Sequence, residues 1–322
     1  MSEPKGLEWF GHHKLLRKII ISGKMRNEEP LRVGAGPGKA ALSPTDLVVL
    51  KVTRADGLEV PVIPGSSLKG LFRATCVSLV RALELGACDG LPRATCLRGN
   101  EFDNIEGSSS REVEDKISLI ARMGVCPLCL LFGSPGLASH VDFDDCYPVS
   151  KFKFGYRTCV AIDRRKGSAA PGALFTVEYV EPGCEWNFEL RADNTPNYLL
   201  GLLMEVVELI NAGLVKVGGM KSKGFGRVSI SINSIKVVSL DHERYGVSSE
   251  RKLRRLDPID VDVMWHGPLP KEGSWSVEAE GEDARRVIDD LREAWRSCAT
   301  RLRELYDGRK WRWEVALNRG GP

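Results

Sequence analysis

The segment from residue 195 to residue 233 constrains the fold more than any other part of the sequence. Thr195 is a good N-cap, Pro196 suits the first position of a helix, and Gly213 is typical of a helix end. Apolar residues between them recur at helical spacing: Tyr198, Leu199, Leu202, Leu203, Val206, Leu209 and Ile210. After a basic glycine-rich loop, apolar residues alternate with polar ones in the clearest strand pattern of the chain: Val228, Ile230 and Ile232. The sequence therefore predicts a helix, a loop and a strand in this order.

The other patterns predict that strands and helices alternate along the chain. A first strand is expected at residues 16–26, a helix at 66–86 and a strand within 141–149. Further strands are expected in the two arms of a hairpin and in one alternating segment: residues 157–162, 174–180 and 186–190. Without its insertions, this order matches the β-α-β-β-α-β arrangement of ferredoxin-like and RRM-like α+β folds. Such folds commonly bind RNA on the sheet, although a fold alone does not establish a function.

The chain divides into a core with large additions. With 322 residues it can bury a large core, as one elaborated domain or two. We expect residues 1–86 and 138–240 to form the ferredoxin-like core, with a thumb-like loop at 157–180. Residues 87–137 are expected to form an inserted cysteine-rich helical subdomain.

A C-terminal extension follows, residues 241–322, to which the sequence assigns no role. It is rich in charged residues, and residues 282–306 predict an amphipathic helix. It also holds most of the tryptophans: Trp265, Trp275, Trp295, Trp311 and Trp313.

Composition restricts the class of protein. The net charge of +3 is too small to mark a nucleic-acid binder, so any basic surface has to be local. No apolar run reaches the ~18 residues of a membrane span, and the first residues lack the apolar centre of a signal peptide. Nine cysteines, an odd number, argue against a secreted disulfide framework. We therefore expect a cytoplasmic protein without a membrane partner. The absence of glutamine and the 28% of charged residues weakly suggest a thermophile.

Polar and basic residues cluster where the first predicted helix begins. Ser66 and Ser67 are followed by Lys69 and, one turn later, by Arg73. The simplest interpretation is a serine N-cap with exposed charges. However, cations in the first turn oppose the helix dipole unless an anion binds there. A phosphate site is therefore the alternative interpretation.

Residues 216–227, KVGGMKSKGFGR, form a second basic segment without any acidic residue. Its glycines permit close approach of the backbone to a ligand, and Phe225 offers a face for stacking. The residues that predict nucleic-acid binding are Gly218, Gly219, Lys221, Lys223, Gly224, Phe225 and Arg227. A solvated glycine-rich turn remains the alternative.

A third basic segment covers residues 151–172. Its loop at 163–172 carries Arg164, Arg165 and Lys166, and we expect it to be too long for a tight hairpin. It is either a basic thumb that reaches along RNA or a mobile surface loop. Separate basic, glycine-rich loops in a nearly neutral chain favour polyanion binding.

The cysteines of the predicted insertion have metal-ligand spacing. Cys126 and Cys129 form a C-x-x-C pair, and Cys88 and Cys96 precede them. Four thiolates would complete a tetrahedral zinc site, and zinc would stabilise a segment poor in core residues. His140 is an alternative ligand in place of Cys88 or Cys96. Buried free thiols or a disulfide are the other interpretations.

Several motifs occur together in one order between about residues 16 and 237: LRVGAGPGK, PTDLVVLKV, VPVIPGSSLKGLFRA, LLFGSPG and GGMKSKGFGRV. In this combination the chain resembles the RAMP superfamily of CRISPR-associated proteins. It is most similar to the repeated backbone subunit, of the Csm type, in type III interference complexes. The insertion at 87–137 and the C-terminal extension exceed the compact members of that family.

The resemblance implies a function in antiviral defence. Copies of the subunit would stack with other subunits along a CRISPR guide RNA that pairs with a single-stranded target RNA. The residues at 66–73 and 216–227, together with Gly34 and Lys39, would contact RNA. The loop at 163–172 would wedge into the guide–target duplex as a thumb. Asp46 would cleave the target RNA as an endoribonuclease with Mg²⁺ or another divalent cation.

Other functions remain open at this stage. Asp46 could simply cap a turn after Pro44, which would leave a binding-only structural subunit. Relatives in the same superfamily cut repeat RNA without metal, and the adjacent His12 and His13 keep that activity open.

Overall fold

A five-stranded antiparallel sheet forms the centre of the protein. The computed structural model describes residues 6–34, 45–91, 95–97, 113–163 and 165–317. The strands lie in the order β11 (Ser276–Glu280), β8 (Val228–Val238), β1 (Lys18–Asn27), β7 (Glu185–Asp193) and β4 (Val141–Phe143). Each adjacent pair is antiparallel.

The topology is ferredoxin-like, as predicted. Helix α1 (Gly65–Ala82) connects β1 to β4, and helix α5 (Asn197–Asn211) connects β7 to β8. The resulting chain order is β1-α1-β4-β7-α5-β8, with β1 and β7 at the centre of the sheet. The strand predicted over 141–149 is shorter than expected, since β4 ends at Phe143.

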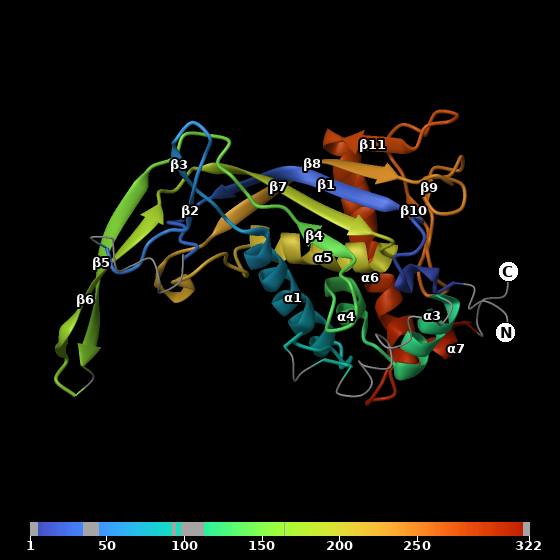
Figure 1. Ribbon diagram of the computed structural model, residues 1–322, viewed down its shortest axis with the longest axis horizontal. Helices are drawn as coiled ribbons and strands as arrows, with labels where there is room; N and C mark the ends of the chain where they lie inside the picture. Colours follow the sequence, from blue (N-terminus) through green and yellow to red (C-terminus); the bar gives the residue numbers. More distant parts are fainter. Residues whose placement is uncertain (1–5, 35–44, 92–94, 98–112, 164, 318–322) are drawn as a thin grey trace.

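The two faces of the sheet differ. One face packs against α1, α5 and α6 (Gly281–Leu305), which all lie on the same side (Figure 1). The other face carries ion pairs, such as Lys18 with Asp193 at 3.1 Å and Lys24 with Glu185 at 3.1 Å. No aromatic residue of the five strands points outward on this face. Because RRM-type recognition stacks bases on sheet aromatics, this face lacks that means of binding RNA.

The C-terminal extension belongs to the same core. Strand β11 extends the sheet beside β8, and the helix predicted over 282–306 is confirmed as α6, which packs on α5. A Cβ atom on Gly201 would lie 1.9 Å from the carbonyl oxygen of Leu291, so only glycine permits this close packing. Four of the extension's tryptophans are buried, whereas Trp275 is 68% exposed.

A buried polar network joins the extension to the first turn of α5. The carboxylate of Asp260 accepts hydrogen bonds from the backbone N–H groups of Asn197, at 2.9 Å, and Tyr198, at 3.1 Å. Pro196 is the N-cap residue, so the predicted cap by the Thr195 side chain is wrong. The Thr195 hydroxyl donates instead to Asp193 O. A distant carboxylate caps this helix, and no local pattern reveals it.

A long hairpin projects from the body of the protein (Figure 1). It consists of β5 (Phe154–Asp163) and β6 (Ser168–Val180). Because Asp163 pairs with Ser168, the connection is a tight turn, and the expectation of a loop too long for one is wrong. Arg165 and Lys166 therefore lie at the tip of a two-stranded ribbon.

The remaining elements are short. They are η1 (Glu8–Phe10), β2 (Lys51–Thr53), β3 (Glu59–Pro61), α3 (Val113–Met123), α4 (Pro127–Phe132), η3 (Lys221–Lys223), β9 (Lys252–Leu253), β10 (Val263–Met264) and α7 (Trp313–Leu317). None of the described helices is both long enough and apolar enough to cross a membrane.

Candidate nucleic-acid interface and metal centre

Four segments that are distant in sequence meet beyond the C-terminal end of β1. Residues 31–34 bond to the end of β6 through Leu31 and Val180, whose backbone groups exchange hydrogen bonds of 3.0 and 2.8 Å. Residues 47–50 join them, because Leu50 N donates to Val33 O at 2.8 Å. The loop at 216–227 completes the group, since Gly219 N donates to Arg32 O at 2.8 Å. Two predicted RNA-binding segments, the one that contains Gly34 and the loop at 216–227, therefore meet at the base of the hairpin, beside the segment that follows Asp46.

Glycine is required where this loop touches residues 31–34. Gly218 has φ +80°, and a Cβ atom there would lie 2.3 Å from Arg32 O. Gly226 has φ +90° and would bring a Cβ within 2.3 Å of Val217 O. Gly224, in contrast, has open space around it. The loop glycines thus mainly permit backbone-to-backbone packing.

Arg32 is a candidate binding residue that the sequence patterns did not single out. Its guanidinium is half-buried beside Gly34 and Gly219: Cβ atoms there would lie 2.7 Å from Nη2 and 3.3 Å from Nη1. Burial lowers the pKa of Arg32, and within the described residues no hydrogen bond or ion pair joins its guanidinium to a carboxylate. Its position in LRVGAGPGK was the available signal. A partly desolvated cation of this kind favours an anionic ligand.

Phe225 does not offer a stacking face. Its side chain is 0% exposed and packs edge-on against Tyr179, with ring centroids 5.5 Å apart. The Arg157 guanidinium lies 4.7 Å from its ring centroid. The prediction of base stacking on Phe225 is therefore wrong, and the ring instead anchors the loop to the hairpin.

The lysines of the loop have different surroundings. Lys216 forms an ion pair of 2.8 Å with Glu29. Lys223 Nζ lies 5.5 Å from the Phe175 ring centroid, on the hairpin. Burial lowers the pKa of Lys221, and no carboxylate contributes to that shift. Lys221 and Lys223 are the cations of this loop without a described carboxylate partner, whereas the exposed Arg227 lies beside the Glu29 carboxylate, to which its backbone N–H donates at 3.2 Å.

Asp46 lies at the base of the hairpin. Its side chain is exposed, and Oδ2 accepts a hydrogen bond of 2.7 Å from the backbone N–H of Thr176. The next residue, Leu47, forms a parallel bridge with Val177. This hydrogen bond therefore connects Asp46 to the hairpin. The alternative interpretation, in which Asp46 caps the turn after Pro44, is not what this bond does.

Glu178 fixes this arrangement from inside. It is 3% exposed and accepts hydrogen bonds from Val49 N at 3.0 Å, Lys51 Nζ at 2.7 Å and Tyr156 Oη at 3.3 Å. A buried carboxylate with a charged partner and two further donors is well satisfied. It joins the segment that carries Asp46 to both strands of the hairpin.

The tip of the hairpin carries exposed cations. Arg165 and Lys166 are exposed, and Arg165 N donates to Asp163 Oδ1 at 2.8 Å. Arg164 and Lys39, also predicted to bind RNA, lie outside the described residues.

Helix α1 begins differently from the prediction. Pro64 is its N-cap residue, and Gly65 N donates to the Asp145 carboxylate at 2.8 Å. A Cβ atom on Gly65 would lie 1.9 Å from Phe143 O, so the glycine permits close packing on β4. Ser66 and Ser67 lie exposed in the first turn and form no cap, so the serine N-cap interpretation is wrong.

The two basic residues of α1 that were predicted to bind RNA contact residues 129–139 rather than the loop at 216–227. Lys69 Nζ donates to Ser139 Oγ at 2.8 Å. Arg73 donates from Nη1 to Gly133 O at 2.8 Å and from Nη2 to Cys129 Sγ at 3.8 Å. The structure thus gives Arg73 protein partners beside the cysteines.

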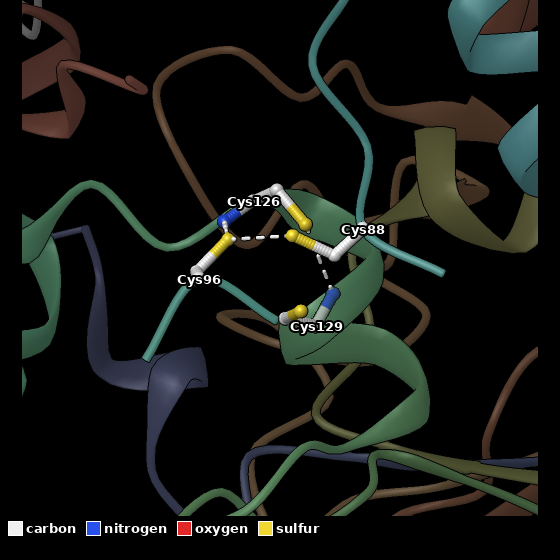
Figure 2. Close-up of side chains that lie close together, drawn as sticks. All are labelled: Cys88, Cys96, Cys126 and Cys129. Atoms are coloured by element: carbon white, nitrogen blue, oxygen red, sulfur yellow. Dashed lines mark hydrogen bonds between the residues drawn. The ribbon is translucent and has the colours of Figure 1, made fainter. Parts of the chain in front are cut away.

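The four predicted cysteines come together. Their sulfur atoms lie within 4.8 Å of one another and point toward a common centre (Figure 2). Cys88 Sγ and Cys96 Sγ are 3.2 Å apart. A tetrahedral zinc site with Zn–S bonds of about 2.3 Å has sulfur atoms about 3.8 Å apart, so the spacing fits a metal ion.

Backbone and charge surroundings suit bound thiolates. Cys126 N donates to Cys96 Sγ at 3.1 Å, and Cys129 N donates to Cys126 Sγ at 3.4 Å. Hydrogen bonds from Cys126, Cys88 and Cys96 lower the pKa of the Cys129 thiol, whereas the bond with Cys129 raises the pKa of Cys126. Metal binding to such coupled thiols is accompanied by release of their protons.

His140 is not a fourth ligand. Its Nδ1 lies 2.8 Å from Asp193 O, and burial lowers its pKa to about 4. It stacks on the exposed His12, with ring centroids 4.2 Å apart. His12 and His13 precede β1, whereas Asp46 and the loop at 216–227 lie beyond its other end, about 30 Å away for a ten-residue strand. The structure therefore separates these two histidines from Asp46 and that basic loop.

A sequence model of the RAMP superfamily matches residues 24–229 of this chain. The matched range includes all four segments that meet at the base of the hairpin, as well as the cysteines. No curated protein matches the sequence.

Proposed function

The chain belongs to the RAMP superfamily, and on that premise we propose that it is a guide-RNA-binding backbone subunit of a type III CRISPR interference complex. Family membership supports a CRISPR-associated, RNA-binding protein. The observation that carries the finer proposal is the convergence of Arg32, Lys221 and Lys223 at the base of the hairpin, each without a described carboxylate partner. Such cations bind the phosphates of single-stranded RNA without reading its sequence.

The hairpin and the polar start of α1 complete the proposed RNA surface. The exposed Ser66 and Ser67 add hydroxyl donors at one side. The hairpin tip, with Arg165 and Lys166, would act as the thumb between guide and target RNA. Further copies of the chain would continue the surface along the same guide, and we place the protein in the cytoplasm.

Asp46 is the proposed catalytic residue for target-RNA cleavage. Oδ2 is held by Thr176 N, so the exposed carboxylate has a fixed orientation at the base of the thumb. Carboxylate oxygens suit Mg²⁺, which would activate a hydroxyl nucleophile and stabilise the leaving oxygen. RNA phosphates would supply further ligands. The second candidate function is RNA binding without cleavage, because Asp46 also has a structural bond.

We also propose that Cys88, Cys96, Cys126 and Cys129 hold a structural Zn²⁺. Four thiolates within a few ångström are the donor set of closed zinc sites. Metal binding here would connect residues 88–96 to α4 and, through Arg73, to α1. Zinc therefore stabilises the insertion rather than taking part in RNA cleavage.

The RNA-binding proposal is tested with the double variant Lys221→Ala, Lys223→Ala. We expect the affinity for a single-stranded oligoribonucleotide to fall about tenfold, because two phosphate contacts are lost. The slope of log K against log salt should decrease by about 1.4, at about 0.7 for each single-strand phosphate contact.

The matched control is Lys271→Ala, Lys310→Ala, which removes the same charge from the C-terminal extension. Filter binding at several salt concentrations measures both quantities. Equal affinity and slope in the two double variants would contradict the proposal.

A further inference from the structure

A shallow groove of about 510 Å³ lies between α1 and the segment that leads into the loop at 216–227. The apolar part of its lining comes from both sides: Leu71, Leu79, Leu209, Leu214 and Val215. Leu214 is 74% exposed, so its side chain is accessible to a ligand in the groove. The groove is within the size range of small-ligand sites, about 300–1,000 Å³.

The groove continues the proposed RNA surface. Ser67 precedes Leu71 by one helical turn, so both lie on the same face of α1. Lys69 and Arg73 lie on another face, where they contact Ser139 and Cys129. The Ser67 face of the helix therefore leads from the exposed serines into the groove.

The charged lining of the groove suits a phosphate. Two lysines line it, and Lys216 is neutralised by Glu29 at 2.8 Å. Lys221 has no carboxylate among the causes of its lowered pKa, which comes from burial alone. Lys221 thus supplies a positive charge beside an apolar wall.

The polar lining offers hydrogen-bond acceptors. The Thr75 hydroxyl donates to Leu71 O at 2.9 Å, and the Ser78 hydroxyl donates to Ala74 O at 3.2 Å. Both residues line the groove, and since their protons are engaged, their oxygens are left to accept. Nucleobases carry N–H donors on their edges and have flat, apolar faces.

We propose that this groove binds the base of one nucleotide of the bound RNA, with Lys221 at its phosphate. The base packs against the leucines and donates to Thr75 or Ser78. The inference rests on the proposed RNA binding and adds a base contact to a surface otherwise built for the backbone. The contact is tolerant of sequence because the apolar wall accepts any base face.

The test compares an oligouridylate with an oligomer of equal length and charge that lacks its bases. The wild-type protein should bind the oligouridylate at least fivefold more tightly. Ala74→Glu, an exposed substitution inside the groove, should reduce this preference at least threefold. Ala82→Glu, two turns further along α1 and outside the groove, adds the same charge and should keep the preference.

Leu214→Ser is a second test variant, because removing an exposed side chain does not disturb the core; it should also reduce the preference. Equal preference in Ala74→Glu and Ala82→Glu overturns the proposal while leaving RNA binding intact. Loss of self-association in Ala74→Glu with an unchanged preference, measured by sedimentation, assigns the groove to a second copy and also overturns it. Failure of the wild-type protein to bind either oligomer instead contradicts the proposed function itself.

Discussion

Two arginines at opposite ends of β1 show how the two ends of the protein differ. Arg17 directly precedes the strand, and Arg32 follows it by a few residues. The Arg17 guanidinium is fully buried and donates to Arg254 O at 2.6 Å, Thr195 O at 2.5 Å and Asn197 Oδ1 at 2.8 Å. Arg32 is half-buried beside two glycines and has no carboxylate among its described partners.

The difference separates a structural cation from a binding cation. Burial lowers the pKa of Arg17 to about 10, but Asp260, Asp262 and Asp257 oppose the shift, so its charge is compensated inside the protein. The pKa of Arg32 is lowered by burial without such compensation. An uncompensated, partly buried charge is retained where a ligand supplies the opposite charge. We therefore propose that RNA binds at the end of the sheet near the hairpin.

The largest expected effect is on stability, in Arg17→Ala. Removing this side chain takes away the positive charge near the buried Asp260. It also removes the donor to four acceptors: Tyr245 O, Arg254 O, Thr195 O and Asn197 Oδ1. We expect the free energy of unfolding to fall by about 3–5 kcal/mol, as when one partner of a buried pair is removed. Urea denaturation followed by tryptophan fluorescence measures the change.

Arg32→Ala is the matching substitution at the other end of β1, and its effects are to be compared with those of Arg17→Ala. It should lower the affinity for single-stranded RNA about 5- to 20-fold and change the free energy of unfolding by less than about 1 kcal/mol. If both variants lose stability equally and Arg32→Ala binds RNA normally, the distinction between the two ends is wrong.

At the hairpin end, Asp46→Ala separates cleavage from binding. In assembled complexes we expect target-RNA cleavage in Mg²⁺ to fall about 100-fold or more, which corresponds to about 2.7 kcal/mol of transition-state stabilisation. RNA affinity should change less than threefold, because Arg32 and the lysines remain. Single-turnover cleavage and filter binding measure the two quantities.

Asp56→Ala is the matched control for this experiment. Asp56 is an exposed carboxylate in the turn between β2 and β3, paired with Arg54 at 3.7 Å. Cleavage that survives in Asp46→Ala to the same degree as in Asp56→Ala would favour the binding-only subunit.

Much of the fold could be predicted from local patterns. Alternating residues identified β6, β7 and β8, the strand expected at 16–26 corresponds to β1, and the apolar periodicity identified α1, α5 and α6. The short strand β11 and the buried role of most tail tryptophans were missed, because pairing with β8 is a long-range contact without a local signal. For the same reason the Asp260 cap of α5 could not be read from the residues around Thr195.

Some residues of the candidate sites could be predicted from the sequence, and others could not. The C-x-x-C pair identified the cysteine cluster, because metal geometry imposes a short spacing. Phe225 was assigned to stacking although it is buried, since composition does not reveal which side of a loop packs against a hairpin. Glu178 was missed because an acidic residue in an alternating strand resembles an exposed one.

The next prediction concerns the cysteine cluster and asks how much metal binding there stabilises the protein. Wild-type protein should contain about one zinc per chain, and Cys129→Ser should lose it, because a four-ligand site loses one thiolate. We expect Tm to fall by about 2–4 °C for each kcal/mol of lost stability. Elemental analysis and calorimetry measure both.

The control for the zinc experiment is Cys159→Ser, which changes a half-buried cysteine on the hairpin, outside the cluster. It should keep its zinc. Full metal content in Cys129→Ser would show that this thiol is not a ligand.

The smallest expected effect is a pH dependence at the end opposite the hairpin. Burial and the neighbouring Asp260 raise the pKa of Asp257 from 3.8 to about 7, and burial raises that of Asp260 to about 6 despite Arg17. Between about pH 4 and 7 the folded protein therefore holds protons that the unfolded chain has released. By linkage, these groups stabilise the fold at low pH, and their contribution is lost as the pH rises through this range.

Asp257→Asn keeps an oxygen for the N–H groups of Ile259 and Asp260 but cannot titrate, so its free energy of unfolding should fall less between pH 4 and 7 than that of the wild-type protein. Urea titrations at several pH values measure the slope; an identical slope in both proteins would mean that Asp257 is ionised in the folded state across this range.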